Sequence, residues 1–236
     1  MTATAPRFAA DAVVFDAYGT LFDVHSVAAT AERLVPGRGA ALSQLWRTKQ
    51  LEYTWLQSLM GPAAREDFAA VTAHALDYAL AALGAPLDVA SRRVLQDVYL
   101  TLAPYDDVST ALAALAPRSR WILSNGTLAM LEPLVRHSGV NALIDGVLSV
   151  DAAGVYKPDP RVYQLAVDRL ALPRSRIAFV SSNCWDAIGA KSFGFTTFWI
   201  NRANAPVDRH GPPPAGSSPR LRICRRCLPK ACIARR

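Results

Sequence analysis

The chain has 236 residues, of which 51% are hydrophobic and 19% are charged, a composition typical of a globular protein with a substantial core. No apolar run approaches the length of a membrane span, so we expect neither an integral membrane protein nor a membrane partner. Residues 1–11 lack a basic region followed by an apolar stretch, which favours an unprocessed, cytoplasmic protein.

The net charge of +7 is concentrated at one end of the chain. Seven basic residues and no acidic residue follow Pro214, so the rest of the chain is formally neutral. Three of the four cysteines lie in the same segment and indicate no disulfide framework. We therefore expect no nucleic-acid partner for the folded part, and a protein that binds through its basic tail is the alternative hypothesis.

An apolar run at residues 13–15 predicts a buried strand that ends in Asp16 and a Gly-Thr turn. In open α/β sheets the reactive crevice lies beyond the carboxyl ends of the strands, so Asp16 stands where a nucleophile would be displayed. Taken alone, this segment fits an aspartate that only caps a turn equally well.

Residues 23–103 show helical periodicity and no convincing strand. Apolar residues recur at helical spacing over 42–56 and 68–83, and a third helix is predicted at 88–102. Glycine and proline separate these helices. We therefore expect an all-helical insertion directly after the first strand.

From residue 105 onward, helices alternate with short apolar strands, predicted at 121–123, 147–150, 177–180 and 196–200. This alternation predicts a parallel sheet, and so an α/β fold with a Rossmann-like doubly wound core and an inserted all-helical cap domain. The expected domains are core at 1–22, cap at 23–103, core again at 104–212, and a basic, disordered tail at 213–236.

Polar residues stand at the end of each predicted strand, where the carboxyl ends of parallel strands meet. In chain order they are Asp16 and Thr20, Ser124 and Asn125, Lys157, and then Ser181, Asn183 and Asp186.

Six segments in this order resemble the haloacid dehalogenase superfamily, and within it the L-2-haloacid dehalogenases. They are FDAYGTLFDVHSV, LWRTKQLEYTWL, ILSNG, SVDAAGVYKPDPRVYQLA, FVSSNCWDAIGA and FGFTTFWINR. The resemblance implies hydrolysis of L-2-haloalkanoic acids to D-2-hydroxy acids through a covalent ester on Asp16. It also implies a homodimer.

Two features separate this chain from the Mg²⁺-dependent phosphatases of the same superfamily. Those enzymes carry a second aspartate two residues after the nucleophile as an acid for the leaving group, and here that position is Tyr18. Their acidic metal ligands after the fourth strand are replaced by Asn183, with Lys157 expected nearby. We expect no cofactor and no metal, and a phosphatase is the alternative.

The resemblance also implies roles for single residues. Asp16 is the nucleophile, Asp186 the base that activates water, and Thr20, Lys157, Ser181 and Asn183 orient the reacting groups. Ser124 would bind the substrate carboxylate, and Arg47, Asn125 and Trp185 the departing halide. Tyr18, Leu51, Phe68 and Trp185 would line the alkyl pocket, and Tyr163 would support Lys157 or Asp16. Plain packing explains Leu51, Phe68 and Tyr163 equally well, and Arg47 taken alone fits a solvated helix arginine better.

The C-terminal segment departs from the resemblance. Residues 211–219 contain three consecutive prolines with Gly and Ser and are expected to form neither helix nor strand. Cys224, Cys227 and Cys232 lack a fourth ligand at suitable spacing, so we expect no zinc site. The Arg-, Pro- and Cys-rich composition suggests the hypothesis that a frame change near Pro214 replaced a closing helix.

Overall fold

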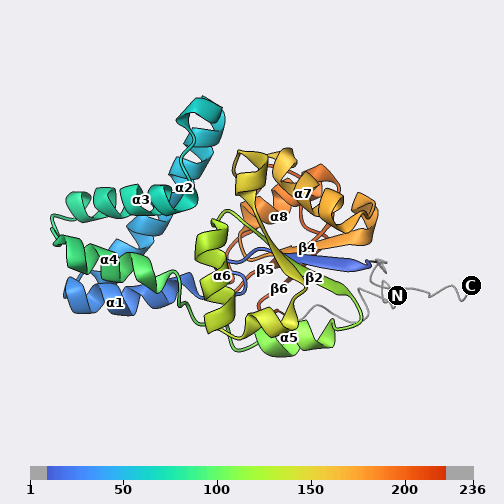
Figure 1. Cartoon of the computed structure of the whole chain (residues 1–236), viewed down its shortest axis with the longest axis horizontal. Coiled ribbons are helices and arrows are strands. Elements are labelled where there is room, and N and C mark those ends of the chain that lie inside the picture. Colours follow the sequence, from blue (N-terminus) through green and yellow to red (C-terminus); the bar gives the residue numbers. More distant parts are fainter. Residues whose placement is uncertain (1–9, 222–236) are drawn as a thin grey trace, which may run out of the picture.

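The computed structural model describes residues 10–221 and places six strands in one sheet, in the order β3-β2-β1-β4-β5-β6 (Figure 1). All neighbouring strands are parallel, as predicted. The bounds are β1 Ala12–Phe15, β2 Ser119–Ser124, β3 Gly146–Ser149, β4 Ile177–Ser181, β5 Thr196–Ile200 and β6 Gly216–Ser218.

The strand β1 lies inside the sheet because its residues are all apolar and fully buried. Val14 pairs with Trp121 of β2 on one side and with Phe179 of β4 on the other. The strand order changes direction between β1 and β4, and a crevice forms at the carboxyl ends of strands at such a point. Asp16 directly follows β1 and so lies at this crevice.

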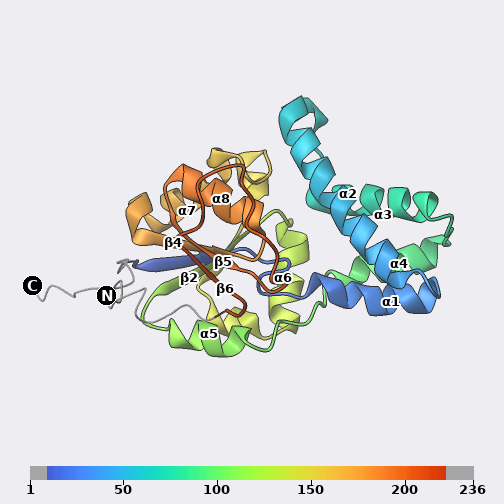
Figure 2. The ribbon, with the colours of Figure 1, turned by 180° about the vertical axis from the view of Figure 1, so that it is seen from behind.

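Helices cover both faces of the sheet, with α7 and α8 on one face and α5 and α6 on the other (Figures 1 and 2). Their bounds are α5 Val108–Ala114, α6 Leu128–His137, α7 Pro160–Leu170 and α8 Cys184–Phe193. Within residues 10–221, no helix combines the length and the apolar character needed to cross a membrane.

Between β1 and α5 in sequence, four α-helices form the predicted all-helical cap at one end of the core (Figure 2). They are α1 Val27–Leu34, α2 Gly39–Met60, α3 Phe68–Ala82 and α4 Val89–Val98. The buried Trp46 of α2 joins α2 to α3, because its Nε1 donates a 2.8 Å hydrogen bond to the carbonyl of Thr72.

The two chain crossings between core and cap lie side by side. Phe22 forms a β-bridge with Pro104, and the Asp23 amide donates a 3.0 Å hydrogen bond to the carbonyl of Ala103. We propose that the boundaries of the cap lie at these crossings, because backbone contacts there hold the two connecting segments together.

The C-terminal segment differs from the expectation. Gly216–Ser218 form β6, which pairs with β5, and Leu221 is buried in the core. The predictions that residues 211–219 form no strand and that a disordered tail begins at 213 are therefore wrong for this part. Its conformation is set by the edge of β5, since the Ala215 amide donates to Thr197 and the Asn201 amide to Ser218. Residues 222–236, with the expectations for Cys224, Cys227 and Cys232, lie outside the described residues.

Candidate active site

The carboxylate of Asp16 is buried and receives hydrogen bonds from several elements. On Oδ2 it accepts from Asn183 Nδ2 at 2.8 Å, from Thr20 Oγ1 at 3.0 Å and from Ser181 Oγ at 3.5 Å. On Oδ1 it accepts from Lys157 Nζ at 3.0 Å. One oxygen is therefore crowded with donors, whereas the other has a single partner among the described residues.

Lys157 connects Asp16 to a second buried carboxylate. Its Nζ lies 3.0 Å from Asp16 Oδ1 and 3.0 Å from Asp186 Oδ2, and the side chain is 1% exposed. Burial alone would lower the pKa of Lys157, but the two carboxylates outweigh it and raise that pKa. Lys157 therefore stays charged and offsets both acids.

Asp186 is fully buried and binds Tyr163 as well as Lys157. The Tyr163 hydroxyl donates to Asp186 Oδ1 at 2.8 Å. Burial raises the pKa of Asp186 to about 6, and the charge of Asp16 adds to this, against the opposing effects of Lys157 and Tyr163. At neutral pH, Asp186 is therefore a carboxylate with unusual affinity for a proton. Tyr163 contacts Asp186 rather than either of its predicted partners, Lys157 and Asp16.

The turn after Asp16 brings Thr20 back to the carboxylate. Gly19 adopts a φ of +84°, a conformation that side chains rarely permit. Thr20 Oγ1 then accepts a 2.7 Å hydrogen bond from the Ser182 amide while donating to Asp16, which links the ends of β1 and β4. Ser182 was not among the predicted site residues, because a serine in a loop gives no signal of this contact.

The end of β2 supplies the next pair of predicted residues. Asn125 Oδ1 accepts a 3.1 Å hydrogen bond from the backbone amide of Lys157 and so ties the Lys157 loop to β2. Ser124 is fully buried, and its Oγ accepts from the Gly126 amide at 3.1 Å, which leaves its hydroxyl proton available for another acceptor.

Aromatic rings from core and cap form a wall beside these residues. Tyr18 stacks on Phe68 with 5.7 Å between ring centroids and meets Tyr99 edge-on at 5.7 Å. A side chain at position 126 would stand 2.9 Å from the Tyr18 ring, so Gly126 makes room for it. Burial raises the pKa of Tyr18 far above its usual value, so its hydroxyl stays protonated. Tyr99 is a member of this wall that the sequence analysis missed.

The cap adds Arg47 and Leu51 from α2. Both line a cavity of about 480 Å³ that also reaches Asn183, on the loop before α8. Trp185, at the start of α8, is half-buried and packs edge-on against Trp55 of α2 at 5.4 Å. The structure thus brings cap residues and strand-end residues to one cavity.

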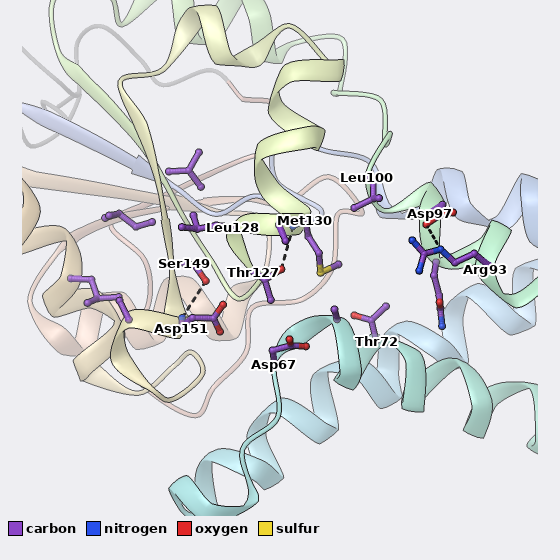
Figure 3. Close-up of a pocket in the computed structure, with 17 residues that line it drawn as sticks. Asp67, Thr72, Arg93, Asp97, Leu100, Thr127, Leu128, Met130, Ser149 and Asp151 are labelled. Carbon is purple, nitrogen blue, oxygen red and sulfur yellow. Dashed lines mark hydrogen bonds and ion pairs between the residues drawn. The ribbon is translucent and has the colours of Figure 1, made fainter.

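A larger cavity of about 710 Å³ lies between α3 and α4 of the cap and α6 and β3 of the core (Figure 3). Asp67, Arg93, Thr127, Ser149 and Asp151 line it, but none of the predicted site residues does. The cavity at Arg47 and Asn183 is therefore the better candidate for the active site, although it is the smaller one.

The residues around Asp16 do not fit a Mg²⁺ ion. The ammonium group of Lys157 lies between the two carboxylates, and Asn183 turns its amide N–H₂, a donor, toward Asp16. Within residues 10–221, no three Asp, Glu, His or Cys side chains come close enough to hold a metal ion.

Comparison with known proteins identifies similar chains. The family model of haloacid dehalogenase-like hydrolases matches residues 10–194. An (S)-2-haloacid dehalogenase of Pseudomonas sp. strain YL is 48% identical over 204 residues, which cover 86% of this chain and 87% of that protein.

Solved structures give the same result. An L-2-haloacid dehalogenase with 46% identity has a TM-score of 0.88 and covers 91% of this chain and 96% of its own. The L-2-haloacid dehalogenase of Xanthobacter autotrophicus with chloropropionic acid covalently bound is 41% identical, with a TM-score of 0.84 and coverage of 90% and 95%.

Proposed function

This chain belongs to the haloacid dehalogenase-like hydrolase family, and we propose that it hydrolyses L-2-haloalkanoic acids to D-2-hydroxy acids. The observation that carries the proposal is the buried Asp16, held by Lys157 and Asn183 instead of a metal site and with no carboxylic acid at position 18. A carbon–halogen bond needs a nucleophile and a site for the halide ion, but no acid to protonate the leaving group.

Substrate binding uses both domains. Ser124 and the backbone amides after Asp16 receive the substrate carboxylate, while Arg47, Asn125 and Trp185 surround the halogen. Because these donors are fixed before the halide leaves, they stabilise the negative charge that develops on it in the transition state.

Asp16 attacks the carbon that carries the halogen from the side opposite the halogen, which inverts its configuration. Oδ1 is the attacking oxygen, since Oδ2 already accepts from Asn183, Thr20 and Ser181. Holding the two reactants in line removes much of the entropic barrier, an effect that reaches about 7–11 kcal/mol in favourable cases.

Water then hydrolyses the ester at the carboxyl carbon of Asp16. Asp186 takes the proton of this water, because its raised pKa makes it a better base than an ordinary aspartate. Oδ2 becomes the carbonyl oxygen of the ester, and its three donors stabilise the charge that forms there. The bond between the carboxyl carbon of Asp16 and Oδ1 then breaks, and Oδ1 leaves as the hydroxyl oxygen of the hydroxy acid with the proton that Asp186 had taken up.

Two experiments test the proposed function. Halide release is measured with L- and D-2-chloropropionate and compared with a generic phosphatase substrate, in excess chelator and with added Mg²⁺. We expect release from the L enantiomer alone, unchanged by either addition.

In a single turnover in heavy-oxygen water with enzyme in excess, the label should enter Asp16 before it enters product. Immediate label in the product would mean direct attack by water.

We also propose that the enzyme is a cytoplasmic homodimer. The last turns of α2 expose the apolar residues Trp55, Leu56, Leu59 and Met60, with Leu59 84% exposed. An apolar patch of this kind favours association. Light scattering should give twice the mass of the chain, and a Leu59→Lys, Met60→Lys variant should give the mass of a single chain.

A further inference from the structure

Gln50 lies three residues after Arg47 on α2, so both side chains are on one face of the helix. Gln50 is fully buried, and both ends of its amide are used. Its Oε1 accepts a 2.6 Å hydrogen bond from Arg47 Nη1, and its Nε2 donates to Thr72 Oγ1 at 2.7 Å. A neutral amide thus connects Arg47 to α3.

The far end of this connection is fixed in turn. The Thr72 hydroxyl donates to the carbonyl of Phe68 at 2.6 Å, and the carbonyl of Thr72 accepts from Trp46. Figure 3 shows Thr72 on α3, where the cap faces the core. Arg47 is therefore connected through Gln50 to a buried residue of α3.

The two arginines that line the 480 Å³ cavity differ in their partners. Arg202 makes a two-pronged ion pair with Asp107, with both N–O distances 3.0 Å, so its charge is compensated. Arg47 makes no ion pair with any acid of residues 10–221, and its hydrogen-bond partner there is the uncharged Gln50. The positive charge of Arg47 is therefore available to an anion in the cavity.

We propose that Gln50 is a positioning residue, which holds the Arg47 guanidinium in place without neutralising its charge. This inference rests on the proposed function, in which Arg47 receives the departing halide. A glutamate at this position could accept the same hydrogen bond but would compensate the charge. A methionine has similar length and could neither orient nor neutralise Arg47.

The contrast between these two substitutions provides the test. Chloride is the probe, as the product halide, and its affinity is measured by chloride NMR line broadening and by product inhibition. We expect Gln50→Glu to weaken chloride binding at least tenfold, and Gln50→Met to weaken it two- to fivefold. With L-2-chloropropionate as substrate, kcat should fall further in Gln50→Glu than in Gln50→Met. Lys49→Ala changes the half-buried neighbour of Gln50, which pairs with Glu52, and should leave both values unchanged.

Several outcomes would overturn the inference: wild-type protein that binds no chloride, Gln50→Glu that binds it as tightly as wild type, or Gln50→Met that weakens it as much as Gln50→Glu. A merely structural role predicts the last of these. If Gln50→Glu does not fold, Thr72→Val removes the acceptor for the Gln50 amide and should weaken chloride two- to fivefold, and wild-type affinity would overturn the inference. If the wild type releases no halide, the proposed function is wrong. The line broadening of chloride does not require turnover and would still test the role of Gln50.

Discussion

At the scale of single residues, the site depends on one ammonium group shared by two buried acids. Lys157 is 3.0 Å from both Asp16 and Asp186, and all three side chains are almost fully buried. A buried charge is costly unless it is paired, so each member of this triad requires the others. One ammonium group thus compensates the charges of the proposed nucleophile and of the proposed base.

Activity should fall in acid as Asp186 takes up a proton. The proposed base works as a carboxylate, and its pKa is about 6, so kcat should drop about tenfold per pH unit below that value. The hydrogen bond from Tyr163 stabilises the carboxylate and lowers its pKa. Tyr163→Phe should therefore move the acid limb of the kcat profile to higher pH. An acid limb that stays in place would show that Asp186 does not set it.

Replacing Lys157 should cost stability in a pH-dependent way. Lys157→Met leaves Asp16 and Asp186 buried without a positive partner, which should lower the free energy of unfolding by about 3–5 kcal/mol at pH 8. At pH 5 the loss should be smaller, because a carboxyl with a raised pKa takes up a proton and becomes neutral. Urea unfolding at both pH values measures the difference. Lys49→Met, which removes a half-buried pair with Glu52 within one helix, is the control and should unfold like wild type.

At the scale of elements, the strands with strong apolar signals were predicted well and β6 was not. The predicted strand at 196–200 has the bounds of β5, whereas Gly216–Ser218 contains no β-branched or aromatic residue. β6 exists because β5 offers unpaired backbone groups, and such tertiary pairing leaves no trace in the local sequence. The helix at 88–102 was predicted too long for a similar reason, since α4 ends at Val98 where the chain turns back toward the core.

The segment after β6 should contribute to stability through Leu221. Its side chain is 1% exposed, and its amide donates a 2.7 Å hydrogen bond to Asp107. Leu221→Ala should lower the free energy of unfolding by about 2–5 kcal/mol, as for other buried leucines. Val89→Ala, at a position that is 85% exposed, is the control and should change it by less than about 0.5 kcal/mol. Equal effects in denaturant unfolding would mean that Leu221 does not pack in the core.

At the scale of the whole molecule, the sequence predicted the polar groups at the strand ends better than the residues that hold them. Asp16, Lys157, Asn183 and Asp186 meet in one cluster because parallel strands place their carboxyl ends together. Gln50 was missed because a neutral helix residue has no chemical signature, and its importance appears only when its two partners are seen. The contact of Tyr163 with Asp186 likewise depends on the packing of α7 against α8, which no motif encodes.

The C-terminal segment also reaches the active site. The Leu221 amide binds Asp107, Asp107 binds Arg202, and Arg202 donates to the carbonyl of Thr20 in the nucleophile loop at 3.0 Å. A series of hydrogen bonds therefore links Leu221, which lies beyond Pro214, to the loop that carries Asp16, although the predicted site residues all precede Pro214 in the sequence.

Two shortened chains should distinguish the contribution of β6 and Leu221 to thermal stability from that of the residues beyond Leu221. A chain that ends at Leu221 keeps the β5–β6 pairing and the contacts of Leu221, so its Tm should lie within about 2 °C of the full chain. A chain that ends at Pro212 loses the pairing of β5 with β6 and the burial of Leu221. Its Tm should fall by at least about 5 °C, since about 1 kcal/mol corresponds to 2–4 °C in a chain of this size. Calorimetry of the three chains provides the comparison.

The hypothesis of a frame change can then be tested on the same background. If a frame change near Pro214 removed a closing helix, another reading frame of the gene beyond Pro214 should encode a segment with helical apolar periodicity. Adding that segment after Leu221 should raise Tm, because burial of apolar surface contributes about 25 cal/mol per Å². Halide release should rise as well, since Leu221 is linked through Asp107 and Arg202 to the nucleophile loop. If neither frame encodes such a segment, or the extended chain melts no higher, the hypothesis is wrong, and the basic segment is native and needs another explanation.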